Sequence, residues 1–194
     1  CITTPTLEQT KGNSSTVHVT TKVVNSSNQP NRLSLVYTIL DEKGNTVTKS
    51  KCEKVLSPHQ VWNADQTTPA VKSPLLWSPY APHLYTLKTL LYSSNGLIDS
   101  ISNQFGFRWF KFTADSGFFF NGKHLYFSGA NVHQDQAGWG DAVTEAAMRR
   151  DILLMKEAGF DLIRGSHYPH APAFSQACDE EGMLFWSVPT FWSI

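Results

Sequence analysis

The sequence has 194 residues, of which 41% are hydrophobic and 16% charged, a composition typical of a folded chain and not of a disordered one. The formal net charge is zero, so the chain has no excess charge with which to attract nucleic acid or an anionic membrane. No apolar run approaches the roughly 20 residues that a membrane-spanning helix needs, and we find no signal-peptide pattern.

The first hundred residues alternate between apolar and polar positions in short runs. One run carries Val17, Val19, Thr21 and Val23 on one face, and the next carries Leu33, Leu35, Tyr37 and Ile39. Residues 42–45 and 95–96 are typical of hairpin turns. Short strands at this spacing, with no long helix before residue 140, indicate an antiparallel β-sandwich of immunoglobulin-like type. The Cys, Trp, Cys spacing of true immunoglobulin domains is absent, so this prediction depends on the strand pattern.

From residue 124 onwards the pattern changes to alternating strands and helices. Residues 125–130 predict a buried strand, and Thr144 then caps a helix whose apolar face includes Met148, Ile152 and Met155. Gly159 ends this helix, and residues 160–163 predict a second strand. Strand, helix and strand with short links indicate a right-handed parallel unit.

A second helix and a third strand follow in the same way. Pro172 suits a first helical position, Gly182 closes the helix, and residues 183–188 predict the third strand. In parallel α/β folds the residues just after the strands face the working crevice. We therefore expect the polar side chains that follow the first two strands to share one rim.

Several segments together resemble glycoside hydrolase family 2. GANVHQD, DILLMKEAGF and IRGSHYP resemble the opening of its catalytic barrel, and residues 76–85 and 105–108 resemble its sandwich and the junction between the two. The resemblance covers about residues 70–194 and implies a multidomain β plus α/β protein. We expect an immunoglobulin-like β-sandwich at residues 1–104, followed at residues 105–194 by an incomplete TIM (β/α)8 barrel, since a full barrel needs eight strand–helix units and about 250 residues.

The resemblance implies a retaining exo-glycosidase that acts on β-linked glycosides. RGSHYP and the DILLMK helix look most like the β-galactosidase branch, while β-glucuronidase and β-mannosidase stay open as alternatives. Val132 and Gln134 flank His133 where the family often has Arg and Glu, a departure that bears on which sugar is preferred. A non-catalytic carbohydrate-binding or scaffolding relative is a further alternative, as is a purely structural fragment that associates with itself.

Glycoside hydrolysis requires two carboxyl groups. In the family the acid/base is a Glu in an Asn-Glu pair on the fourth barrel strand, and the nucleophile is a Glu near the seventh. The 194 residues contain no Asn-Glu pair. We therefore assign no catalytic residue and expect the chain alone to be inactive.

By the same resemblance, His133, Arg164 and His167 line the subsite for the non-reducing sugar. Imidazoles can donate hydrogen bonds to sugar hydroxyls, and the Arg164 guanidinium can orient a catalytic carboxylate and keep it ionised; the alternative for Arg164 is a structural ion pair at the barrel mouth. Asp135 suits either a sugar hydroxyl or a loop cap. Trp192 is a candidate for stacking on a sugar face.

A metal or another cofactor is not expected. His133 and Asp135 with His167 and His170 resemble a metal site only superficially, because the prolines around His170 rule out helical spacing. The three cysteines are too few for a disulfide scaffold. Cys1 fits a lipidated mature N-terminus or, as we prefer, an arbitrary boundary, so a periplasmic or secreted location and a cytoplasmic one both stay open. The expected partner is a β-linked glycoside, not nucleic acid, and the complete protein can form a homo-oligomer.

Overall fold

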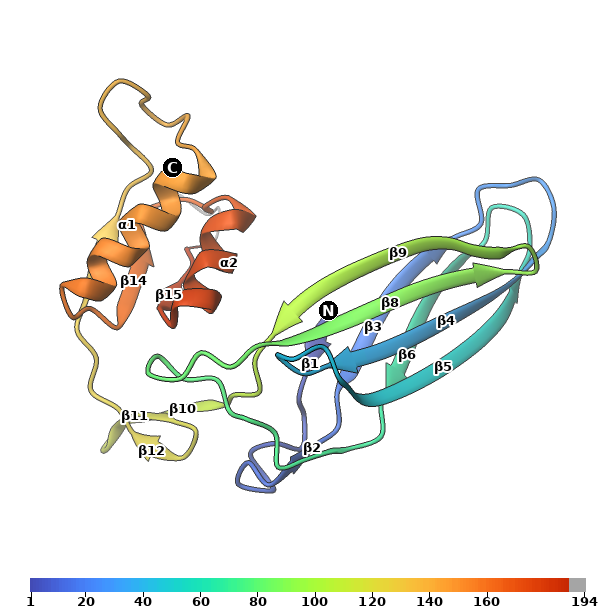
Figure 1. Ribbon diagram of the computed structural model, residues 1–194, viewed down its shortest axis with the longest axis horizontal. Coiled ribbons are helices and arrows are strands. Elements are labelled where there is room, and N and C mark those ends of the chain that lie inside the picture. Colours follow the sequence, from blue (N-terminus) through green and yellow to red (C-terminus); the bar gives the residue numbers. More distant parts are fainter. Residues whose placement is uncertain (189–194) are drawn as a thin grey trace. The chain divides into compact units, whose positions relative to one another are not determined.

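The computed structural model describes residues 1–188, which divide into two compact units (Figure 1). The first unit comprises Cys1–Leu76 and His83–Phe110. The second comprises Trp77–Pro82 together with the chain from Lys111 onwards. A short segment that lies within the first unit in sequence therefore belongs to the second in space.

The first unit is built from two main antiparallel sheets. One sheet has the strand order β5-β4-β8-β9, and these long strands lie side by side in Figure 1. The other has the order β1-β3-β6, and a two-stranded sheet pairs β2 with β7. The strands are β1 (Ile2–Thr3), β2 (Ser14–Ser15), β3 (His18–Val24), β4 (Asn31–Leu40), β5 (Thr46–Leu56), β6 (Val61–Thr67), β7 (Val71–Lys72), β8 (Tyr85–Ser93) and β9 (Gly96–Phe105).

The alternating pattern of the sequence forms the core of this unit. On β4 the predicted inward residues Leu33, Leu35, Tyr37 and Ile39 are all buried, and they cluster with buried residues of β3, β6 and β8. Because successive side chains of a strand point to opposite faces, one apolar face per strand is enough to build a two-layer core. The predicted sandwich strands are confirmed here.

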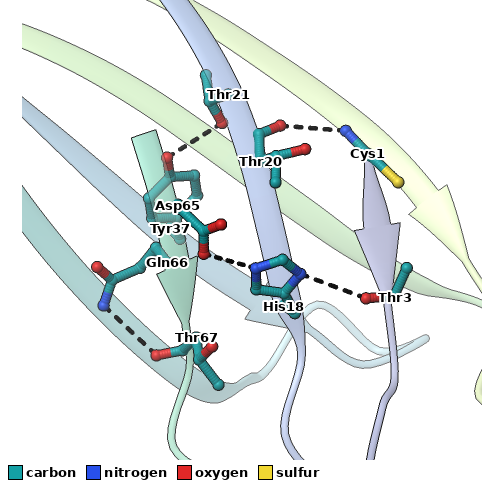
Figure 2. A network of polar contacts seen from close by, with 9 residues as sticks. All are labelled: Cys1, Thr3, His18, Thr20, Thr21, Tyr37, Asp65, Gln66 and Thr67. Atoms are coloured by element: carbon teal, nitrogen blue, oxygen red, sulfur yellow. Dashed lines mark hydrogen bonds and ion pairs between the residues drawn. The ribbon is translucent and has the colours of Figure 1, made fainter. Parts of the chain in front are cut away.

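Polar contacts tie these layers together (Figure 2). The hydroxyl of Tyr37 on β4 donates to Thr21 Oγ1 on β3 at 3.0 Å, so this bond links the two sheets. Within the second sheet, His18 Nε2 lies 2.6 Å from Asp65 Oδ1 on the paired strand β6. The buried tyrosine thus satisfies its polar atom inside the core, as a buried hydroxyl must.

The second unit contains a small antiparallel sheet and a parallel one. The antiparallel sheet joins β10 (Phe110–Thr113), β11 (Gly117–Phe120) and β12 (Lys123–His124). The parallel sheet has the order β13-β14-β15, with α1 and α2 as the connections between neighbours (Figure 1). Its elements are β13 (Gly129–Val132), α1 (Glu145–Glu157), β14 (Leu162–Gly165), α2 (Pro172–Glu181) and β15 (Leu184–Trp186).

Both helices begin and end as the sequence predicts. The Thr144 side chain accepts a hydrogen bond from the Ala147 amide at the start of α1, and Pro172 is the first residue of α2. Gly182 closes α2 in the left-handed conformation, with φ of 71°. The buried faces of the two helices pack with Ile163 of β14 into a second core. No helix in the described part of the chain is long and apolar enough to cross a membrane.

The parallel strands begin later than the sequence predicts. β13 starts at Gly129, whereas the apolar run suggested a strand over residues 125–130, and β14 starts at Leu162 instead of residue 160. The pairing explains the shift: the register with β14 begins at Gly129 and Leu162, whereas the Leu125 amide donates to the Phe118 carbonyl of β11 at 3.0 Å. Tyr126 is instead 85% exposed, and the Phe127 ring contacts Phe118 of β11 at 5.3 Å.

The segment Trp77–Pro82, hereafter the 77–82 segment, is anchored to α1, α2 and the turn after α2. The indole of Trp77 is fully buried and donates to the Asp179 carbonyl at 2.7 Å. The Lys156 ammonium donates to the carbonyls of Pro79 at 2.6 Å and Gly182 at 2.8 Å. These bonds satisfy a carbonyl of the segment and carbonyls near the end of α2, which would otherwise lack partners.

Candidate functional site

The candidate site lies at the carboxyl ends of two adjacent parallel strands. In the register of β13 and β14, Asn131 pairs with Arg164 and Val132 with Gly165. His133 follows β13 directly, and Ser166 and His167 follow β14. Parallel strands present their carboxyl ends on one edge of a sheet, and so these polar residues share a rim, as predicted.

Arg164 is held by neutral partners. Its Nη1 donates to the Ser166 hydroxyl at 3.1 Å and, over a longer 3.4 Å, to Asn131 Oδ1. Ser166 is fully buried, and its amide donates to the Val132 carbonyl at 3.0 Å, which fixes the hydroxyl. None of the ion pairs within residues 1–188 involves Arg164. Its positive charge is therefore oriented by the fold but not neutralised by these residues.

The two histidines of the predicted site do come together. The rings of His133 and His167 lie edge to face with centroids 5.3 Å apart, and the Ser166–His167 peptide bond is cis. The Asp135 side chain is exposed at the edge of a small hollow that His133 also lines. Two imidazoles, a guanidinium and a carboxylate on one rim can bind a ligand rich in hydroxyl groups.

Tyr168 is a member of this cluster that the sequence analysis did not single out. Its hydroxyl accepts a hydrogen bond from the Gln134 amide at 2.6 Å, across 34 residues of sequence. Its ring lies 6.2 Å from that of His133. The sequence shows Tyr168 only as a letter of the SHYP motif, and nothing along the chain indicates which backbone group its hydroxyl meets.

His170 lies in an aromatic cluster. Its ring stacks on Tyr168 at 5.3 Å and contacts Phe174 at 4.6 Å and Phe185 at 5.8 Å. Burial lowers the pKa of His170, and the nearby His133 lowers it further, so the ring is neutral at pH 7. His170 therefore belongs to the packing beneath the rim.

The residues described here do not assemble a metal site. Among residues 1–188 there is no group of three or more His, Cys, Asp or Glu side chains placed to hold an ion. The other predicted site residue, Trp192, lies outside the described residues.

Models of known protein families match both units. The model "Glycosyl hydrolases family 2" matches residues 2–108, and the model "Glycosyl hydrolases family 2, TIM barrel domain" matches residues 112–187. The two matches follow each other in the order that the sequence predicted. They confirm the fold class, an immunoglobulin-like sandwich followed by part of a TIM barrel.

Individual relatives match over most of the chain. A putative β-glucuronidase of Formosa agariphila is 34% identical over 95% of this chain and 21% of its own length. The β-galactosidase BoGH2A of Bacteroides ovatus is 31% identical over 87% of this chain and 20% of its own length. The chain thus spans about a fifth of these curated relatives.

Solved structures give the same picture. The crystal structure of a Bacteroides uniformis β-glucuronidase has a TM-score of 0.90 and 36% identity, and it covers 96% of this chain and 22% of its own. The B. uniformis β-glucuronidase 2 covalently bound to cyclophellitol-6-carboxylate aziridine matches with the same TM-score, identity and coverage.

Proposed function

The chain belongs to glycosyl hydrolases family 2, and from this membership we propose that the protein hydrolyses β-linked O-glycosides with retention of configuration. The observation that supports the proposal most strongly is the rim at the ends of β13 and β14. There Arg164 lies on β14, and His133 and His167 directly follow the ends of β13 and β14. Active sites of such barrels lie at the carboxyl ends of the strands.

Each side chain of the rim has a chemical task in this proposal. His133 and His167 donate hydrogen bonds to hydroxyls of the non-reducing sugar, and such bonds can strengthen as the transition state forms. Asp135 accepts a hydrogen bond from a hydroxyl. Arg164, whose described partners are the neutral Asn131 and Ser166, supplies positive charge that keeps a catalytic carboxylate ionised.

The catalytic carboxyl groups come from later strands of the barrel. The 194 residues contain no Asn-Glu pair, so we place the acid/base and the nucleophile on barrel strands that are not part of this sequence. A retaining enzyme needs the two about 5 Å apart, one to protonate the leaving oxygen and the other to attack the anomeric carbon. Trp192 keeps its proposed role of stacking on a sugar face.

For the sugar we propose a β-glucuronide, with a β-galactoside as the second candidate. A relative named as a putative β-glucuronidase matches 95% of the chain in sequence, and the crystal structure of a β-glucuronidase matches 96% of it. One of them is described as covalently bound to a carboxylate-bearing cyclitol aziridine, and a covalent adduct is what a retaining glycosidase can form with such a reagent. The RGSHYP motif and the match to BoGH2A support the β-galactoside.

The domain division is part of the same proposal. We propose that residues 1–104 form the sandwich domain and that residues 105–194 begin the catalytic domain, to which the 77–82 segment is added in space. Whether the complete protein is a homo-oligomer is a separate question that sedimentation of the full-length protein answers.

Hydrolysis of chromogenic sugars by the full-length protein tests the function. We expect p-nitrophenyl β-D-glucuronide to be cleaved with a higher kcat/KM than the β-D-galactoside or β-D-mannoside. A higher kcat/KM for the galactoside would overturn the choice of sugar but not the family. No cleavage of any β-glycoside, together with sugar binding in calorimetry, would replace hydrolysis with the carbohydrate-binding alternative.

A further inference from the structure

Tyr168 joins the loop after β14 to the loop after β13. Its hydroxyl lies 2.6 Å from the Gln134 nitrogen and accepts the proton of that amide. Gln134 is the residue next to His133, so the bond fixes the backbone at the point where the His133 side chain leaves it. The bond thus acts on the backbone of the loop that carries His133.

The tyrosine is itself held from the far side. Its ring stacks on His170 with an interplanar angle of 22°, and His170 packs against Phe174 of α2 and Phe185 of β15. Contacts with β15 and α2, made through His170, therefore fix the position of the Tyr168 ring and its hydroxyl. Side chains that are locked by packing in this way can hold a neighbouring group to a fraction of an ångström.

Gly165 makes this packing possible. A Cβ atom built on Gly165 would lie 2.8 Å from His170 Cδ2 and 2.9 Å from Phe185 Cε2, closer than real Cβ atoms approach other atoms. The His170 ring can occupy its place only because β14 has no side chain there. The Nε2 atom of His170 is buried without a hydrogen-bond partner among the described residues, which indicates that the ring serves as an aromatic spacer.

From these contacts we infer that Tyr168 is a positioning residue for the sugar site, which acts by holding the His133 loop through its hydrogen bond to the Gln134 amide. The inference rests on the proposed glycosidase function. In this inference His133, and not Tyr168, contacts the sugar. The Tyr168 hydroxyl maintains the position of the His133 ring, whose centroid lies 5.3 Å from that of the His167 ring. Rates are sensitive to such placement, because a small displacement of a binding group lowers the rate even when the group is present.

The test is a double-mutant cycle in the full-length protein with its preferred glycoside. We expect Tyr168→Phe to lower kcat/KM about tenfold, the change that follows from losing one hydrogen bond of typical net strength. In a His133→Ala background the same substitution should change kcat/KM by less than about twofold, because Tyr168 acts through His133. An equal loss in both backgrounds would overturn the inference.

A matched control separates positioning from stability. Tyr37→Phe also removes a tyrosine hydroxyl that makes a hydrogen bond, to Thr21 Oγ1 at 3.0 Å, but within the first unit. We expect it to leave kcat/KM unchanged, and a tenfold loss there would show that any such deletion harms activity and would contradict the inference.

Amide hydrogen exchange gives a readout that does not depend on the activity. We expect the Gln134 amide to exchange at least about tenfold faster in Tyr168→Phe than in the wild type, since it loses its acceptor. If the wild type cleaves no glycoside but Gln134 loses protection, the proposed function fails while the hydrogen bond stands. Unchanged protection of Gln134 would overturn the positioning role in either case.

Discussion

Two glycines that follow helices provide a matched pair for testing how the 77–82 segment is held. Gly159 and Gly182 both have positive φ, of 85° and 71°, which an L-residue adopts at a cost of about 1 kcal/mol or more. A Cβ on Gly159 meets no atom within 4 Å, whereas one on Gly182 would lie 2.5 Å from the Pro79 carbonyl oxygen. Alanine at the two positions therefore differs in the clash with the segment.

The expected difference in stability comes from the hydrogen bond that the Pro79 carbonyl loses when it moves. Its carbonyl accepts the Lys156 ammonium at 2.6 Å, and moving it away from an alanine methyl group breaks this bond. A hydrogen bond to a charged group contributes about 1.5–3 kcal/mol, and the partly exposed Lys156 places it at the lower end. We expect Gly159→Ala to lower the free energy of unfolding by about 1 kcal/mol and Gly182→Ala by about 2.5 kcal/mol.

Urea unfolding of each variant measures these losses, and hydrogen exchange of the α2 amides reports which part of the molecule opens. A Lys156→Met substitution should cost less in the Gly182→Ala background than in the wild type, because the bond to Pro79 is already lost there and only the bond to the Gly182 carbonyl remains to be removed. Equal losses at the two glycines would refute the account of how the segment docks.

Three further predictions concern titratable groups. Burial, and to a smaller extent the charge of Asp179, raises the pKa of the Cys178 thiol to about 12. We expect iodoacetamide at pH 8 to modify the exposed Cys1 in the native chain but Cys178 only after unfolding. Rapid labelling of Cys178 in the native chain would contradict its burial. The pKa of His170 is lowered in the folded chain, so between that value and the ordinary pKa of about 6.5 the unfolded chain binds more protons and stability falls as the pH falls. Urea midpoints from pH 7.5 to 5.5 should decline less steeply in His170→Asn than in the wild type, and equal slopes would argue against this sign. Arg149 donates to Glu181 at 2.7 Å and also to Glu180, whose pKa it lowers, so this stabilisation is present above about pH 4.5 and disappears as the pH falls through the folded-state pKa. We expect Arg149→Met to cost about 1 kcal/mol at pH 7, a modest value because the pair is partly exposed, and to differ little from the wild type at pH 3; the same loss at both values of pH would show that the ion pairs are not its cause.

The sequence predicts the elements of this fold where a local rule decides them. Alternation defines the inward residues of β4, and the capping residue Thr144 and the terminal Gly182 define helix ends, because these choices depend on neighbours in the chain. Strand ends in the parallel sheet depend on a partner far away. The run before Gly129 is apolar enough for a strand, but the strand begins only where Leu162 is present to pair with it.

The candidate site divides in the same way. Polar residues after consecutive strands predict a shared rim, and the structure brings His133, His167 and Arg164 to it. The sequence could not show that Tyr168 meets the Gln134 amide, since that contact depends on how two loops 34 residues apart are folded. For the same reason it could not show that the 77–82 segment joins the second unit, through contacts such as that between Trp77 and Asp179, 102 residues apart.

The central claim is that Arg164 of this chain supplies positive charge to the sugar site of a glycosidase. The most direct measurement is kcat/KM for the preferred β-glycoside in the full-length protein and in its Arg164→Gln variant. Gln keeps a hydrogen-bond donor but removes the charge, and we expect kcat/KM to fall at least about 100-fold, as for other preorganised groups that stabilise charge in an active site. A kcat/KM within about twofold of the wild type, the range in which no catalytic interaction is lost, would contradict the claim.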